Sequence, residues 1–257
     1  MEVLSMNDWD SKHYKKHATV QQSVALRIIE GLKFSGNEQV LDIGCGDGKV
    51  TSKIAELIPD GQVIGMDVSV NMICEAQLTY AHIPNLSFVQ KDVQSFTFDQ
   101  KFDLVTSFFA LHWVANHELV LGNIKAVLNK GGKIIFIMPV GGDKRIGKVF
   151  GREPWKSCIK HKPEQFGHIS IDRYHQLLDQ FCFTKEKVEI VELTHIFKTL
   201  QDLSNYFMTW LPYYTGLPQE RCQQLAHELA ETIAYDQGAK SDIALSSSML
   251  YVCAHLD

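Results

Sequence analysis

Short apolar runs alternate with amphipathic segments along the first half of the chain. The runs are apolar on both faces, as strands buried in a parallel sheet are. They predict five strands, at Gln39–Ile43, Gln62–Met66, Leu86–Val89, Phe102–Phe108 and Gly132–Pro139. The segments between them have apolar positions at three- and four-residue spacing and predict helices at Val50–Ile58, Asn71–Tyr80 and Leu119–Leu128. This alternation predicts an α/β fold, with a parallel sheet covered by helices on both faces.

Beyond Pro139 the pattern is less regular. Gly141–Phe166 shows no clear period and is classed as an irregular region. Periodicity returns further on and predicts helices at Ser170–Gln180, Leu200–Trp210 and Pro218–Tyr235, and strands at Lys187–Lys198 and Ser247–His255. There is no internal repeat, so one domain over residues 1–257 is expected.

Composition narrows the class of protein only a little. The net charge of −5, without a run of like charges, does not favour a nucleic-acid partner. The six cysteines form no CxxC pair, which favours reduced, mostly buried thiols over a disulfide framework or a metal site. The polar opening MEVLSMNDWDSKHYKKH and the lack of about 18 consecutive apolar residues lead us to expect no signal peptide, no membrane contact and a cytoplasmic location.

The stretch VLDIGCGDGKVT, from Val40 to Thr51, has three alternating glycines between a predicted strand and a predicted helix. Such a turn allows close approach to the backbone, and the helix N-terminus offers free N–H groups. A dinucleotide site of the type G-x-G-x-x-G would need a glycine where Lys49 stands, which weakens that interpretation. The alternative is a tight turn that binds nothing.

Two carboxylates follow neighbouring predicted strands. Asp67 closes the second strand, where an acidic residue can accept both hydroxyls of a ribose, in NAD or in another nucleoside. Asp92 follows the third strand and could accept from the exocyclic amine of adenine, while Val93 offers its backbone N–H. Asp92 could equally be a solvated turn residue.

Taken together, VLDIGCGDG, the strand-ending GMD, KDV, SFFALHWV and LNKGGK occur in an order and spacing that resembles class I S-adenosylmethionine-dependent methyltransferases, over Gln39–Val140. The resemblance implies a Rossmann-like, seven-stranded, mostly parallel sheet with a late antiparallel strand. It implies S-adenosylmethionine as cofactor, S-adenosylhomocysteine as product and no metal. It also divides the domain into an N-terminal arm (1–35), a cofactor-binding core (36–140) and two substrate-cap segments (141–185 and 199–240).

Residue by residue, the resemblance implies that Asp42 faces the α-ammonium, Asp67 the ribose, and Asp92 with Val93 the adenine. The full set of expected cofactor contacts is Asp42, Gly44, Cys45, Gly46, Gly48, Asp67, Val68, Met72, Asp92, Val93 and Ser107.

The segment SFFALHWVANHE should lie beside the reacting methyl group. His112 is either a base or hydrogen-bond donor for the acceptor or a structural histidine, and Trp113 is either a wall of the acceptor pocket or core. His117 is expected to cap or flank the next helix. Gln21 matches a glutamine that lies near the acceptor in juvenile hormone acid methyltransferases.

Further resemblances bear on the acceptor. NDWDSKHY is similar to the opening of trans-aconitate methyltransferases, and VTSFFALHWVANHELVLGNIKAVLNKGG is similar to juvenile hormone acid methyltransferases; malonyl-carrier methyltransferases are related. They imply a small-molecule acid as acceptor, free or carrier-bound, and formation of a methyl ester by a monomer or homodimer. From the N-terminal arm, Trp9, Tyr14 and Gln22 are further candidates to reach the site. Candidate acceptor contacts in the cap are Arg145, Arg152, Trp155, Tyr206, Trp210, Tyr213 and Tyr214.

Three alternatives stay open at this point. The acceptor could be a phenol or a carbon nucleophile, as in quinone biosynthesis, for which His112 would act as general base. The protein could bind the cofactor without catalysis, or it could be an NAD-dependent oxidoreductase.

Overall fold

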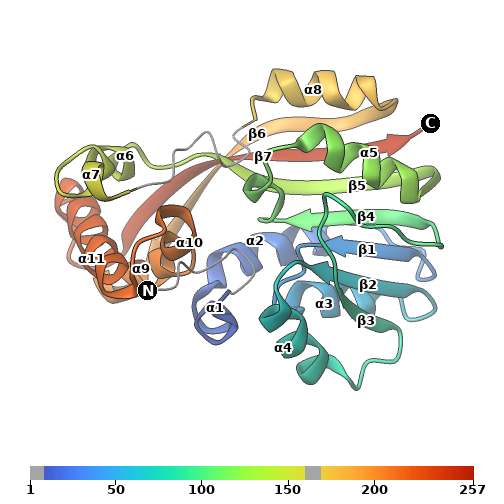
Figure 1. Ribbon diagram of the computed structural model, residues 1–257, viewed down its shortest axis with the longest axis horizontal. Coiled ribbons are helices and arrows are strands. Elements are labelled where there is room, and N and C mark those ends of the chain that lie inside the picture. Colours follow the sequence, from blue (N-terminus) through green and yellow to red (C-terminus); the bar gives the residue numbers. More distant parts are fainter. Residues whose placement is uncertain (1–8, 160–168) are drawn as a thin grey trace.

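The computed structural model describes residues 9–159 and 169–257, and in them seven strands form one sheet of order β3-β2-β1-β4-β5-β7-β6 (Figure 1). Neighbouring strands from β3 to β5 run parallel, and β7 runs antiparallel to both β5 and β6. The Rossmann-like sheet with a late antiparallel strand is therefore confirmed. The strands are β1 (Gln39–Ile43), β2 (Gln62–Asp67), β3 (Leu86–Gln90), β4 (Phe102–Phe108), β5 (Leu128–Gly141), β6 (Phe183–Phe197) and β7 (Ile243–Leu256).

Helices cover both faces of the sheet, as the alternating pattern predicts. On one face, α2 (Thr19–Glu30) and α3 (Lys49–Leu57) bury Ile29 and Ile54 against β1, β2 and β4. On the other face, α5 (His117–Val127) and α8 (Ile171–Gln180) pack against β4, β5 and β7. The helix α4 (Val70–Tyr80) packs on β2 and β3 and begins after Ser69, whose hydroxyl accepts a hydrogen bond from the N–H of Met72 (3.4 Å).

The long strands β6 and β7 extend past the rest of the sheet and carry a group of helices beyond it (Figure 1). We call this group the cap: α6 (Lys144–Phe150), α7 (Trp155–Cys158), α9 (Leu200–Met208), α10 (Leu211–Thr215) and α11 (Gln219–Asp236). Its own apolar core contains Phe207, Leu229 and Ile233, together with Phe197 and Ile243 from the two strands. The cap therefore folds onto the far ends of β6 and β7.

The N-terminal helix α1 (Ser11–His17) connects the core to the cap. On the core side, Lys15 Nζ pairs with Glu75 of α4 at 2.7 Å. On the cap side, His13 Nε2 lies 3.2 Å from the carbonyl oxygen of Asn205 in α9. The first contact is exposed and the second is partly buried, and through them α1 lies across the boundary between the two parts.

Several boundaries differ from the sequence-based expectation. The strand β5 begins at Leu128 instead of Gly132, because a register shift between Phe102 and Leu104 and a left-handed Gly131 (φ 76°) accommodate the NKGG stretch within the strand. The supposedly irregular Gly141–Phe166 contains α6 and α7, and residues 160–168 lie outside the described part. The six cysteines are free, but Cys74 and Cys182 are exposed and only Cys45 and Cys222 are buried, so the expectation of mostly buried thiols is wrong.

His117 does not cap α5. Asn116 does so, its side chain accepting from the N–H of Leu119, while His117 is buried with its ring edge-on to Tyr174 (5.6 Å between centroids). Within residues 9–159 and 169–257, we find no helix long and apolar enough to cross a membrane and no group of three or more His, Cys, Asp or Glu residues arranged for a metal ion.

Candidate active site

A cavity of about 930 Å³ opens at the carboxyl ends of the parallel strands and continues beneath the cap. Most of its lining belongs to two ends. The Asp67 end, as we call it, is formed by residues after β1, β2 and β3, among them Gly44, Gly46, Asp67, Val68, Met72, Asp92 and Val93. The cap end is formed by α6, the segment Tyr206–Tyr214, and the start of β7, with residues such as Ile146, Phe150, Tyr206, Trp210, Tyr214, Leu245 and Met249.

The three glycines of the loop after β1 all have left-handed backbones, with φ of 71° at Gly44, 54° at Gly46 and 81° at Gly48. A Cβ at Gly44 would come within 2.1 Å of the Cβ of Ala110, and one at Gly48 within 2.6 Å of the Phe88 ring. A Cβ at Gly46 would make only an ordinary contact, 3.7 Å from Tyr14. Gly48 is thus required by packing against Phe88, and it does not line the cavity, whereas Gly44 and Gly46 do.

Asp67 lies at the end of β2 with its carboxylate held by the glycine loop. Its Oδ2 accepts from the N–H of Gly46 (3.0 Å) and its Oδ1 from the N–H of Ser69 (2.9 Å). Burial raises the pKa of Asp67 above its ordinary value, and the backbone N–H groups partly offset that effect. These contacts fix the carboxylate at the cavity wall and leave further lone pairs on its oxygens for a ligand hydroxyl.

Asp42 is buried beneath the loop and does not line the cavity. Thr51 Oγ1 donates to its Oδ2 (2.6 Å) and Thr106 Oγ1 to its Oδ1 (2.7 Å). Burial raises the pKa of Asp42 to about 6, against the opposing effect of the two hydroxyls. The carboxylate therefore ties α3 and β4 to β1.

Two other residues expected at the cofactor are also placed in the protein interior. Cys45 is buried next to Ile73, Ala76 and Phe88, and burial raises the pKa of its thiol well above the usual value. Ser107 donates from its hydroxyl to the carbonyl oxygen of Ile43 (2.9 Å) and is buried. Neither side chain lines the cavity.

The segment after β3 forms the outer rim of the Asp67 end. Asp92 is exposed, and its Oδ1 accepts from the N–H of Gln94 (2.8 Å). Val93 also lines the cavity, as do Val68, which follows β2, and Met72 of α4. This end of the cavity therefore combines apolar side chains with two carboxylates, a lining suited to a flat ring with polar groups at its edges.

Gln21, His112 and Trp113 also line the cavity, and we call them its middle part. The ring of His112 lies 4.9 Å from that of Trp113, and both come from the short 3₁₀ turn η1 (Leu111–Trp113) after β4. The Oε1 atom of Gln21 is buried and has no hydrogen-bond partner among the described residues. The neighbouring Gln22 points elsewhere, its Nε2 donating to Asp47 in the glycine loop (3.3 Å).

Aromatic side chains of the N-terminal arm and the cap meet over this middle part. Trp9 stacks on Tyr213 (3.8 Å between centroids, 18° between planes) and meets Trp113 edge-on at 5.5 Å. The hydroxyl of Tyr213 accepts from the N–H of Asp10 (2.6 Å). Trp9 and Tyr14 line the cavity, so the arm contributes to the site as well as anchoring itself.

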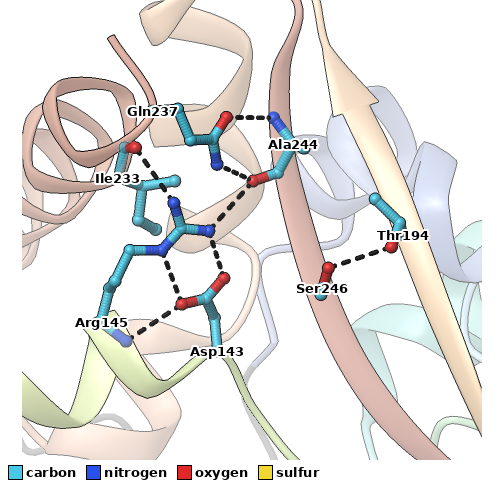
Figure 2. A network of polar contacts seen from close by, with 7 residues as sticks. All are labelled: Asp143, Arg145, Thr194, Ile233, Gln237, Ala244 and Ser246. Atoms are coloured by element: carbon cyan, nitrogen blue, oxygen red, sulfur yellow. Dashed lines mark hydrogen bonds and ion pairs between the residues drawn. The ribbon is translucent and has the colours of Figure 1, made fainter. Parts of the chain in front are cut away.

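The charged candidates of the cap do not reach the cavity. Figure 2 shows Arg145 paired with Asp143, Nε to Oδ1 at 2.7 Å and Nη2 to Oδ2 at 2.5 Å. The guanidinium also donates to the carbonyl oxygens of Ile233 and Ala244, each at 3.2 Å. Arg152 is exposed, and Trp155 is buried with its Nε1 donating to Glu228.

Further residues line the cavity, two of them in the segment SFFALHWVANHE, which was expected beside the reacting methyl group. Phe109 and Ala110 line the cavity after β4, and Phe109 has a left-handed backbone (φ 57°), which is uncommon for a bulky residue and marks this turn as constrained. Ser246 and Met249 of β7 also line it, although they lie more than a hundred residues from the glycine loop. Only the fold brings that strand to the site.

A family model described as a methyltransferase domain matches residues 40–132. Together with the sheet order and the methyltransferase relatives described next, this match shows an enzyme that depends on S-adenosylmethionine as its cofactor and has the class I methyltransferase fold. The alternatives of an NAD-dependent oxidoreductase and of a non-catalytic binding protein are thereby set aside.

The sequence identity to individual relatives is low. The chain is 29% identical over 230 residues to "Putative methyltransferase 235L" of Invertebrate iridescent virus 6, covering 88% of this chain and 86% of that one. It is 26% identical over 178 residues to trans-aconitate 2-methyltransferase of Acidovorax ebreus (67% and 68% covered). It is 30% identical over 129 residues to malonyl-[acyl-carrier protein] O-methyltransferase 1 of Ilyobacter polytropus (49% and 47% covered).

Among solved structures, the fold is similar to phosphoethanolamine N-methyltransferase 2 of Haemonchus contortus in complex with S-adenosylmethionine. The TM-score is 0.60 at 18% identity, with 92% of this chain and 52% of that chain covered. This likeness concerns the fold alone.

Proposed function

We propose that this enzyme transfers a methyl group to a carboxylate oxygen of an apolar small-molecule acid, free or carrier-bound, and so forms a methyl ester. The observation that carries the proposal is the largely apolar and aromatic lining of the cap end, in which Asp143, Lys144, Thr209 and Ser246 are polar exceptions. The similarity to a trans-aconitate methyltransferase and a malonyl-carrier methyltransferase supports an acid as acceptor.

The cofactor would be held at the Asp67 end. The buried carboxylate of Asp67, fixed by the N–H groups of Gly46 and Ser69, would accept the ribose hydroxyls. Asp92 and the backbone of Val93 would bind the adenine edge, with Val68 and Met72 against its faces. Gly44 and Gly46 expose backbone along which the amino-acid tail would lie, with Asp42, Cys45, Gly48 and Ser107 supporting the loop from beneath.

The acceptor would enter from the cap end. S-adenosylmethionine supplies an electrophilic methyl group on a sulfonium, so the protein has to align the acceptor and exclude water. Gln21 and Trp113 would orient the carboxylate through amide and indole N–H groups, with His112 beside them. A carboxylate with a pKa of ~4 is already ionised at neutral pH, so no residue has to remove a proton.

His112 is also the observation that favours a second candidate function. Because it lines the middle of the cavity, it could accept a proton from a phenol or from an acidic carbon. Under this alternative His112 is a general base, and under the main proposal it only orients the acceptor.

A methyl-transfer assay with labelled S-adenosylmethionine and a panel of carboxylic acids and phenols separates the two. We expect label in products that release it in alkali, and a rate change of less than about tenfold in His112→Asn. Alkali-resistant product, with a loss of ~100-fold or more in His112→Asn at unchanged cofactor affinity, would favour the phenol or carbon acceptor and contradict ester formation.

A further inference from the structure

Helix α6 forms one wall of the cap end. Lys144, Ile146, Gly147 and Phe150 line the cavity, while Val149 on the opposite side is fully buried in the cap core. The cavity-facing side of the helix therefore places a glycine between two larger apolar side chains.

Gly147 lies in the middle of α6, where glycine is a poor helix former. Its backbone is not left-handed, and a Cβ added there would meet no atom within 4 Å among the described residues. This contrasts with Gly44 and Gly48, which are required by left-handed backbone and by close packing. Neither the conformation nor the packing of the described residues requires glycine at position 147, and what adjoins it is the cavity.

The wall that contains Gly147 is held firmly at its beginning. Figure 2 shows Asp143 and Arg145 at the start of α6 tied to the last turn of α11 through Ile233 and to β7 through Ala244. Gln237 reinforces this attachment, because its side-chain amide pairs with both the N–H (2.9 Å) and the carbonyl oxygen (2.5 Å) of Ala244. The distance from Gly147 to the facing lining is therefore set by the fold.

We propose that Gly147 is a specificity-determining residue: the apolar chain of the acceptor passes directly over its backbone, and the missing side chain sets how long or bulky an acceptor the cap end admits. This inference rests on the proposed function, since it takes the cap end to hold the acceptor. Straight-chain carboxylic acids are suitable probes of this inference, because their apolar chain can be lengthened without changing the reacting carboxylate.

The test compares the wild type with Gly147→Ala, Gly147→Leu and a control, Lys148→Leu, on the acids from hexanoic to hexadecanoic. Lys148 is exposed on the same helix and does not line the cavity. Binding to the enzyme saturated with S-adenosylhomocysteine is measured by calorimetry, and methyl transfer is measured in parallel. The midpoint of thermal unfolding is recorded for each variant.

We expect Gly147→Leu to weaken binding of the longest acids by ~10-fold or more and to change hexanoic acid little, as one misfitting group does in an apolar pocket. Gly147→Ala should raise Tm by ~2 °C, because alanine favours the helix more than glycine does. The same variant should already narrow the range of chain lengths that the enzyme binds. The control should follow the wild type at every chain length.

An equal loss at every chain length would indicate that glycine provides flexibility to α6 and would overturn the proposal. So would an unchanged profile in Gly147→Leu, or a wild type that binds none of the acids. A wild type that binds the acids in a length-dependent way but methylates none refutes the carboxylate acceptor, and the binding profile still decides the role of Gly147.

Discussion

At the Asp67 end of the cavity, the contacts come from backbone groups and carboxylates close together in the chain, whereas at the cap end they come from side chains of segments far apart. The Asp67 carboxylate is held by N–H groups of Gly46 and Ser69, in the adjoining loops. The wall at the cap end depends on Arg145 reaching the carbonyl oxygens of Ile233 and Ala244. A ligand common to a whole class can be bound by backbone geometry, while a variable acceptor is met by side chains.

The largest predicted effect concerns Gly44, in the glycine loop at the Asp67 end of the cavity. Gly44→Ala should lower the free energy of unfolding by about 4 kcal/mol, because the new methyl group clashes with Ala110 and the backbone is left-handed. Adding Ala110→Gly should recover the steric part and leave ~1 kcal/mol from the backbone. Denaturant unfolding of the two single variants and the double variant measures this, and additive losses would contradict the packing argument.

The contacts of Arg145 that hold the wall of the cap end should contribute to stability without affecting cofactor binding. Arg145→Met leaves the largely buried Asp143 carboxylate without its partner and should cost about 3 kcal/mol of stability. Because the Asp67 end is built independently, the affinity for S-adenosylhomocysteine should stay within ~2-fold while KM for the acceptor rises. Urea unfolding and calorimetry test this, and a parallel loss of product affinity would show that the two ends are coupled.

Asp67 itself should matter mainly for binding. Asp67→Ala removes the carboxylate proposed to accept the ribose hydroxyls and should weaken S-adenosylhomocysteine by ~100-fold, the size expected for hydrogen bonds to a charged group. Asp92→Ala is the matched control at the exposed rim and should cost ~10-fold or less. Calorimetric titration distinguishes the two variants, and equal effects on the affinity would contradict the assignment of the ribose to Asp67.

The smallest effect concerns pH. The pKa of Asp42 is raised from 3.8 to about 6 by burial, so the folded protein binds the extra proton between these values. Stability from this group is therefore present below pH ~4 and is lost as the pH rises through ~6. Asp42→Asn should flatten that part of the stability profile; an unchanged slope in urea unfolding from pH ~4 to ~7 would contradict the assignment.

The sequence predicts the Asp67 end well because its signals are local. The apolar run that ends at Asp67 and the helix predicted from Asn71 lie next to each other in the chain, and the structure confirms both elements. The reason for Gly48 could not be predicted in this way, since Phe88, which fills the space beside it, lies on another strand. The start of β5 was misplaced because the NKGG stretch looks like a breaker and is absorbed by a register shift.

The cap end was harder to predict for the same physical reason. Arg145 could be named as a candidate for a ligand carboxylate, but its internal partner Asp143 and the two carbonyl oxygens that complete its contacts become neighbours only in the fold. Aromatic density did indicate Tyr206, Trp210 and Tyr214, which line the cavity. Gly147 gave no signal, because an exposed glycine in a short helix resembles any loop residue.

The proposed roles of the Asp67 end and of the cap end both depend on where the adenosyl group binds. A crystal structure of the enzyme with S-adenosylhomocysteine tests this most directly. The account predicts ribose hydroxyls on the Asp67 carboxylate, adenine between Val68 and Val93, and the sulfur atom directed towards His112 and Trp113. A ligand bound elsewhere, or one whose ribose makes no contact with Asp67, would contradict it.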